Sequence, residues 1–132
     1  MSAFVLDTNA ALFYAGGMDR RLGKRARAVF AAFDAGEAVL HVPVPVVQET
    51  WFLRQRRGIA PVTPRAFWKR LERAELIFTE LTHEDVLVAS ELDWDHRDPY
   101  DRLIVATALR LDLPLVTADE EITLWGRVEV VW

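Results

Sequence analysis

Ala3-Phe4-Val5-Leu6-Asp7-Thr8-Asn9 decides how the rest of the chain is interpreted, because four apolar residues run directly into a carboxylate. A short, continuous apolar run is typical of a strand buried on both faces, in the middle of a parallel sheet. Ligands of such sheets bind beyond the carboxyl ends of the strands, where Asp7 would lie. Asp7 would equally serve as the N-cap of a helix that begins near Ala10. This stretch alone leaves both interpretations open.

Further apolar strands alternate with amphipathic helices along the chain. The pattern predicts four more strands, at 38–42, 76–81, 113–116 and 128–131. It predicts helices at 10–15, 20–35, 44–57, 64–74, 82–94, 99–111 and 119–124, with a linker at 59–62. The alternation predicts a single α/β domain over residues 1–132, with a parallel twisted sheet of about five strands and helices on both faces.

The composition fits a globular domain with a sizeable core, since 52% of the 132 residues are hydrophobic and 27% are charged. There is no cysteine, which excludes disulfides and thiolate metal sites. Met1 and Ser2 lead directly into strand-like sequence without a basic flank, so we expect no signal peptide. No apolar run approaches membrane-spanning length. These features predict a cytoplasmic protein without membrane contact.

Charge is distributed unevenly along the chain. Residues 18–73 contain 12 Lys or Arg and 5 acidic residues, whereas the remainder contains 4 Lys or Arg and 15 acidic residues. Such a division indicates an anionic partner on one side and a cation-binding centre on the other, although two solvated faces of opposite charge would give the same count. The candidate RNA-binding residues at the end of one basic helix are Arg54, Arg56 and Arg57.

Three more acidic residues occupy positions comparable to that of Asp7. Glu49 lies on an apolar helical face, where a carboxylate is costly to bury unless a salt bridge or a metal pairs with it. Asp101 falls in the first turn of the helix that Asp98 is expected to cap. Asp119 follows a strand as Asp7 does. Capping or interaction with the helix dipole would also explain Asp101 and Asp119.

The predicted topology allows these four carboxylates to meet at one edge of the sheet. Four ionised carboxylates in a small pocket repel one another, and a hard divalent cation relieves that repulsion. Oxygen ligands without cysteine or paired histidines suit Mg²⁺ or Mn²⁺ better than Zn²⁺. A cation held in this way is commonly used on phosphate substrates, where it activates a water and stabilises the leaving oxygen.

The sequence resembles the PIN-domain nucleases, and specifically the VapC-type toxins of bacterial toxin–antitoxin pairs. The resemblance covers essentially the whole chain and is carried by 5–9 (VLDTN), 47–49 (VQE), 98–106 (DPYDRLIVA) and 114–119 (PLVTAD). It implies an acidic site at Asp7, Glu49, Asp101 and Asp119, supported by the neighbouring polar residues Asn9 and Thr117. It further implies Mg²⁺-dependent (or Mn²⁺-dependent) endoribonuclease activity, a homodimer and inhibition by a cognate antitoxin.

Three other kinds of protein share some of these features. A haloacid-dehalogenase-type phosphatase needs a second Asp two residues after the first, where Asn9 stands. A response-regulator receiver needs an acidic pair near the N-terminus and a strand-end lysine, whereas the lysines here are Lys24 and Lys69, in basic helical stretches. A non-catalytic PIN-like module that binds RNA or protein remains the alternative function.

Overall fold

A five-stranded sheet organises the molecule. The computed structural model describes residues 1–57 and 63–132, and the side chains of residues 54–57 lie outside the described part. The strands are β1 (Ser2–Leu6), β2 (Ala38–Pro43), β3 (Ile77–Thr79), β4 (Leu115–Val116) and β5 (Val130–Val131). Their order is β3-β2-β1-β4-β5, and every neighbouring pair is parallel. The predicted α/β class with a five-stranded parallel sheet is confirmed.

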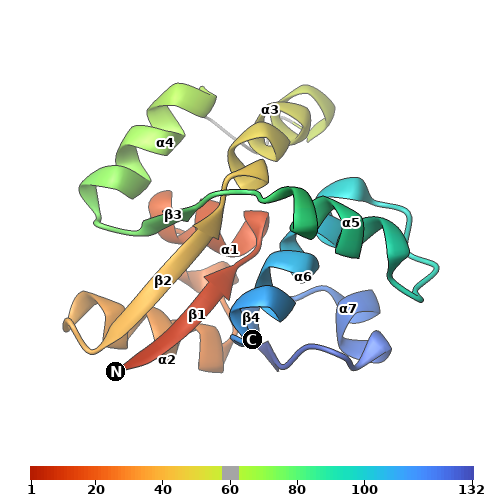
Figure 1. Cartoon of the computed structure of the whole chain (residues 1–132). Coiled ribbons are helices and arrows are strands. Elements are labelled where there is room, and N and C mark those ends of the chain that lie inside the picture. The colour runs from red at the N-terminus through yellow and green to blue at the C-terminus, as the bar shows by residue number, and fades with distance from the viewer. Residues whose placement is uncertain (58–62) are drawn as a thin grey trace.

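The first strand lies at the centre of the sheet and is the point where the strand order reverses. From β1 the chain proceeds outward to β2 and β3, and then returns past β1 to β4 and β5. Right-handed crossovers in opposite directions place helices on opposite faces. Figure 1 accordingly shows α5 (His83–Glu91) and α6 (Pro99–Leu111) in front of the sheet, with α1 (Thr8–Ala15) and α2 (Lys24–Asp34) behind it. A ligand site is expected at the carboxyl ends of β1 and β4.

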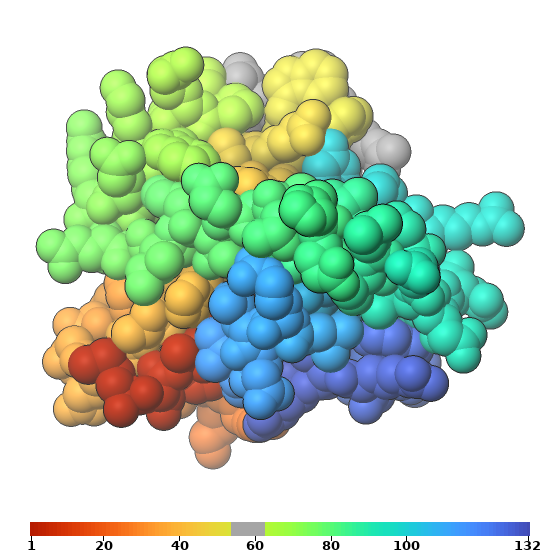
Figure 2. Space-filling model, viewed as in Figure 1, coloured from red at the N-terminus to blue at the C-terminus, as the bar shows by residue number. Residues whose placement is uncertain are grey.

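Figure 2 shows the side chains of α5 and α6 over the middle of the same face. The remaining helices complete the described part of the chain. They are α3 (Pro45–Arg57), α4 (Pro64–Arg73) and α7 (Glu120–Trp125), together with the short 3₁₀ helix η1 (Asp19–Arg21). Within the described ranges, no helix is both long enough and apolar enough to cross a membrane.

The apolar run that opens the chain forms the middle of the core, as predicted. Val5 and Leu6 have no exposed surface, and neither have Leu40 on β2 and Leu115 on β4. Burying a side chain of this size contributes about 1.5–3 kcal/mol. The backbone that carries Asp7 is therefore held by packed neighbours and by the β1–β4 hydrogen bond from the Asp7 amide to the Val116 carbonyl (3.1 Å).

Several element boundaries differ from those predicted. The helix expected over 20–35 is divided into η1 and α2, because the chain is extended at Leu22 and Gly23. Gly23 lies against the C-terminal residue, and a Cβ atom there would lie 2.5 Å from the carbonyl carbon of Trp132. The strands expected at 76–81, 113–116 and 128–131 are shorter, at 77–79, 115–116 and 130–131.

The largest difference lies before α6. The helix expected over 82–94 ends at Glu91, where Leu92 adopts extended backbone angles (φ −57°, ψ 129°). The segment 92–98 then runs without helix to Asp98, the N-cap of α6. The linker predicted at 59–62 lies outside the described residues.

Candidate metal centre

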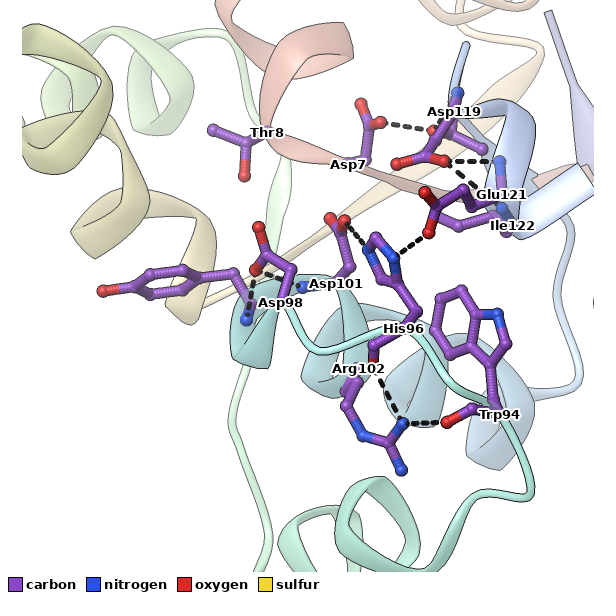
Figure 3. A network of polar contacts seen from close by, with 12 residues as sticks. Asp7, Thr8, Trp94, His96, Asp98, Asp101, Arg102, Asp119, Glu121 and Ile122 are labelled. Atoms are coloured by element: carbon purple, nitrogen blue, oxygen red, sulfur yellow. Dashed lines mark hydrogen bonds and ion pairs between the residues drawn. The ribbon is translucent and has the colours of Figure 1, made fainter. Parts of the chain in front are cut away.

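A cavity of about 320 Å³ lies at the carboxyl ends of β1 and β4 and is bordered by α1, α3 and α6. All four acidic residues singled out in the sequence line it, and a fifth acidic residue, Asp98, joins them. The lining residues are Asp7, Thr8, Asn9, Glu49, Leu53, Asp98, Asp101, Ala118 and Asp119. Figure 3 shows side chains from α1, α6 and the start of α7 directed toward one another in this region. The cavity is therefore strongly acidic.

Asp7 caps α1 and belongs to the cavity at the same time. Its Oδ1 atom accepts a hydrogen bond from the Ala10 amide (2.8 Å), and its Oδ2 atom accepts one from the Thr117 hydroxyl (2.5 Å). The Thr117 hydroxyl in turn accepts a hydrogen bond from the Asp119 amide (3.0 Å). Asp7 thus caps α1, as one interpretation of the sequence predicted, and it also lies at the carboxyl end of β1. Thr117 joins the ends of β1 and β4.

Burial is the main influence on the charge of Asp7, whose exposed fraction is 8%. Desolvation raises the pKa of Asp7 to about 6, although the hydrogen bonds from Thr117 and Ala10 lower it, and the charge of Asp119 raises it further. The ionised form therefore costs free energy in the folded protein unless a cation compensates it.

Asp98 and Asp119 also cap helices with one oxygen. Asp98 Oδ1 accepts hydrogen bonds from the amides of Tyr100 (2.8 Å) and Asp101 (3.3 Å) at the start of α6. Asp119 Oδ1 accepts from the amides of Glu121 (2.8 Å) and Ile122 (3.3 Å) at the start of α7. The Oδ2 atom of each aspartate has no hydrogen-bond partner in the described part of the chain. Capping and ligation therefore do not compete for the same oxygen.

Asp101 shares one oxygen with a histidine that the sequence analysis did not single out. Nε2 of His96 donates to Asp101 Oδ2 (2.6 Å), and Nδ1 of His96 contacts the carboxylate of Glu121 (Figure 3). Burial lowers the pKa of His96, but the hydrogen bonds and charges of the two carboxylates outweigh burial, so the pKa is raised. The signal in the sequence is weak: a lone histidine two residues before the helix cap.

Asp101 itself has a strongly shifted pKa. Desolvation raises the pKa of Asp101 to about 7, while the hydrogen bond from His96 lowers it and the charges of Asp98, Glu49 and Asp119 raise it. Repulsion from neighbouring carboxylates is the signature expected of a site that holds a cation.

Glu49 reaches the cavity from α3 and is half-buried. The hydroxyl of Thr8, the first residue of α1, donates to Glu49 Oε1. Asn9, the next residue, is exposed at the rim of the cavity. The proposed RNA-binding residues of α3 follow Glu49 within two turns, but their side chains lie outside the described part: Arg54, Arg56 and Arg57.

The donor set fits a divalent cation. One donor atom each of Glu49, Asp98 and Asp101 lie within 4.8 Å of one another, as do donor atoms of His96, Asp101 and Asp119. Ligands of Mg²⁺ lie about 2.0–2.1 Å from the ion, so opposite ligands are about 4 Å apart, which is within the limit that both groups keep. Carboxylate oxygens dominate both groups, and Asp101 is common to them.

Comparison with known proteins identifies the class. The family model described as the PIN domain matches residues 4–127, and the chain therefore belongs to the PIN domain family. No curated protein matches the sequence.

Solved structures share the fold at low sequence identity. VapBC from Salmonella typhimurium, solved bound to DNA, has a TM-score of 0.68 and 16% identity, with 98% of this chain and 97% of that chain covered. VapBC2 from Rickettsia felis, bound to a DNA fragment from its promoter, has a TM-score of 0.65 and 12% identity, with 97% of this chain and 96% of that chain covered. VapC20 from Mycobacterium tuberculosis, a sarcin-ricin loop cleaving toxin, has a TM-score of 0.62 and 22% identity, with 99% of this chain and 100% of that chain covered. At these identities the likeness establishes the fold alone.

Proposed function

We propose that this protein is a metal-dependent endoribonuclease that hydrolyses RNA phosphodiester bonds, and that it is the toxin of a toxin–antitoxin pair. The observation that supports the catalytic part is the acidic cavity at the reversal point of a PIN-domain sheet. Five carboxylates line the cavity, and none of its described lining side chains is a lysine or an arginine that would balance their charge. This arrangement suits Mg²⁺ or Mn²⁺ and, through the cation, a phosphate backbone.

We assign the ligand role to Asp7, Glu49, Asp101 and Asp119. A cation bound there would supply an activated water and stabilise the leaving oxygen of an in-line displacement. Asp101 is the common member of both candidate ligand groups. Thr117 holds one oxygen of Asp7, which limits how that carboxylate rotates, and Asn9 at the rim offers an amide to the substrate. RNA phosphates would contact the basic end of α3, at Arg54, Arg56 and Arg57.

The toxin role is proposed from the structural likeness to proteins of VapBC complexes. The partner would be a cognate antitoxin that covers the acidic cavity. The toxin would act as a homodimer. Because its substrate would be RNA, it would act in the cytoplasm. A short neighbouring reading frame whose product co-purifies with this chain and suppresses its cleavage would support this role. Light scattering in solution would establish whether the chain forms a dimer.

The decisive experiment is RNA cleavage by the whole purified protein with Mg²⁺ or Mn²⁺ and with EDTA. We expect cleavage with metal, none with EDTA and none for Asp101→Asn, because the substitution removes a charge that the cation needs. Asp112→Asn is the matched control: it lies at the opposite end of α6, in the left-handed conformation that Asn tolerates. Binding of RNA without metal-dependent cleavage would instead establish the non-catalytic module.

A further inference from the structure

We propose that His96 is a positioning residue, which fixes the carboxylate of Asp101 for the cation through a hydrogen-bonded chain from Glu121 to His96 to Asp101. The inference rests on the proposed metal centre and gives His96 a role other than ligation, although its ring belongs to the candidate group with Asp101 and Asp119. Figure 3 shows the imidazole between the two carboxylates, on the side of Asp101 that faces α7.

The geometry explains what the histidine does. The terminal torsion of an aspartate is broad, so an unheld carboxylate rotates and presents either oxygen to a ligand. His96 Nε2 donates to Oδ2 of Asp101 at 2.6 Å, and the two side chains are 15% and 17% exposed. With Oδ2 engaged, Oδ1 is the oxygen left for a cation. A hydrogen bond to one oxygen thereby selects the orientation of the other.

The histidine is itself held on several sides. Its ring stacks on Trp94, with ring centroids 4.6 Å apart and planes 28° apart, and Trp94 stacks on Trp125 at 4.9 Å. The guanidinium of Arg102 donates to the backbone carbonyls of Trp94 (2.7 Å) and His96 (3.0 Å). The same guanidinium also donates to the carbonyl of Leu92 (3.0 Å). The segment 92–98 is therefore fastened to α6, the helix that carries Asp101.

The contacts favour positioning over direct ligation. Both ring nitrogens face carboxylate oxygens, of Asp101 and of Glu121, and a histidine that ligates a metal needs a nitrogen lone pair directed at the ion. Ligation by His96 would require either its hydrogen bond to Asp101 or its contact with Glu121 to break. As a positioning residue, His96 keeps both. Partners that orient metal ligands typically change metal affinity by about 10–100-fold when they are removed.

Two substitutions separate the hydrogen bond from the ring. In Gln the amide nitrogen is as many bonds from Cβ as Nε2 is in His, so His96→Gln keeps a donor for Asp101. In Asn the amide nitrogen corresponds to Nδ1, so His96→Asn keeps a donor for Glu121 and loses the one for Asp101. Both variants lose the imidazole stack on Trp94. A purely structural role of the ring predicts equal effects, whereas positioning predicts different ones.

The test is the Mn²⁺ dissociation constant of the whole protein, measured by electron paramagnetic resonance of free Mn²⁺. We expect His96→Asn to weaken Mn²⁺ binding about 10–100-fold and His96→Gln to retain most of the affinity. Glu121→Ala should weaken binding by less, and Glu120→Ala, an exposed neighbour on the same turn of α7, should leave it unchanged. Glu121 has a side chain that is 65% exposed, so this pair keeps the test valid even where a His96 variant does not fold.

Provided that the unaltered protein binds Mn²⁺, three results would overturn the inference. Equal Mn²⁺ affinity of the unaltered protein and His96→Asn would show that the hydrogen bond does not position a ligand. Equal losses in His96→Gln and His96→Asn would assign the effect to the ring. A loss confined to Mn²⁺, with Mg²⁺ binding retained, would make His96 a ligand, because nitrogen donors favour Mn²⁺ over Mg²⁺. If the unaltered protein binds no Mn²⁺, the proposed function fails and the inference fails with it.

Discussion

Replacing Asp7 with Asn is expected to stabilise the metal-free protein at alkaline pH, although it removes a proposed ligand. The carboxylate is 8% exposed and burial raises its pKa to about 6 from 3.8. Asn caps helices as well as Asp does, so the hydrogen bond from the Ala10 amide is retained. The substitution removes a negative charge in a desolvated, acidic place. It also replaces the oxygen that accepts from the Thr117 hydroxyl with an NH₂ group, which cannot accept that hydrogen bond.

The magnitude follows from linkage between protonation and folding. Because the folded pKa of Asp7 is raised, its stabilising contribution is fully present below the unfolded pKa of 3.8 and is lost as the pH rises through about 6. A difference of about 2 pKa units corresponds to about 3 kcal/mol, all of which is lost at about pH 8. About half of it is already lost at about pH 5. Asp7→Asn should recover these amounts less the cost of the lost Thr117 hydrogen bond, which is the same at both pH values.

The assay is urea unfolding in EDTA at both pH values for the unaltered protein, Asp7→Asn and the control Asp93→Asn. Asp93 is exposed, and its side chain makes no hydrogen bond among the described residues. We expect a gain of up to about 3 kcal/mol at about pH 8, a gain smaller by about half of that amount at about pH 5, and no comparable pH dependence for the control. A change in stability that is the same at both pH values would refute the claim that desolvation of the Asp7 charge sets its cost.

Three further outcomes are expected. Asp98→Ala should lower the free energy of unfolding by about 0.5–2 kcal/mol because it removes the α6 cap, whereas Asp101→Asn should abolish RNA cleavage. If Asp98→Ala is as inactive as Asp101→Asn but as stable as the unaltered protein, Asp98 belongs to the ligand set. Arg110→Met should cost about 1.5–3 kcal/mol, since it removes a charge-assisted hydrogen bond to the carboxylate of Asp85 (Nε to Oδ1 2.6 Å). An unchanged urea midpoint would argue against this. Charge reversal at the end of α3, at Arg54, Arg56 and Arg57, should weaken RNA binding and flatten its salt dependence in filter-binding titrations. An unchanged salt dependence would show that these residues do not contact RNA.

The part of the fold that could be predicted is the part with local signals. Val5 and Leu6 of the apolar run before Asp7 are fully buried, Ala3 and Phe4 partly so, and the caps Thr82 and Asp98 occupy the expected helix starts. The alternation of strands and helices was sufficient to place Asp7 and Asp119 at one edge, because parallel strands share the direction in which they end. That is why four acidic residues far apart in sequence could be assigned to one cavity.

The part that escaped prediction depends on contacts between distant side chains. Helical periodicity continues to Trp94, but the chain leaves the helix after Glu91, and Arg102 binds alternate carbonyls of the extended segment, from Leu92 to His96. The position of His96 depends on that tertiary contact, so no local sequence pattern predicts its place beside Asp101. Asp98 was expected only to cap α6, and the structure shows that its second oxygen also faces the cavity edge.

The central claim is that the carboxylates at this edge of the sheet bind one class of ligand, a divalent cation. Its most direct test is the free energy of unfolding with and without Mn²⁺ at about pH 8, where the raised pKa values of Asp7 and Asp101 still leave both groups ionised. At about 100 times its dissociation constant, a ligand of the folded state adds about 2.7 kcal/mol. We predict that gain for the unaltered protein and little or none for Asp101→Asn. An unfolding free energy that saturating Mn²⁺ leaves unmoved would contradict the account.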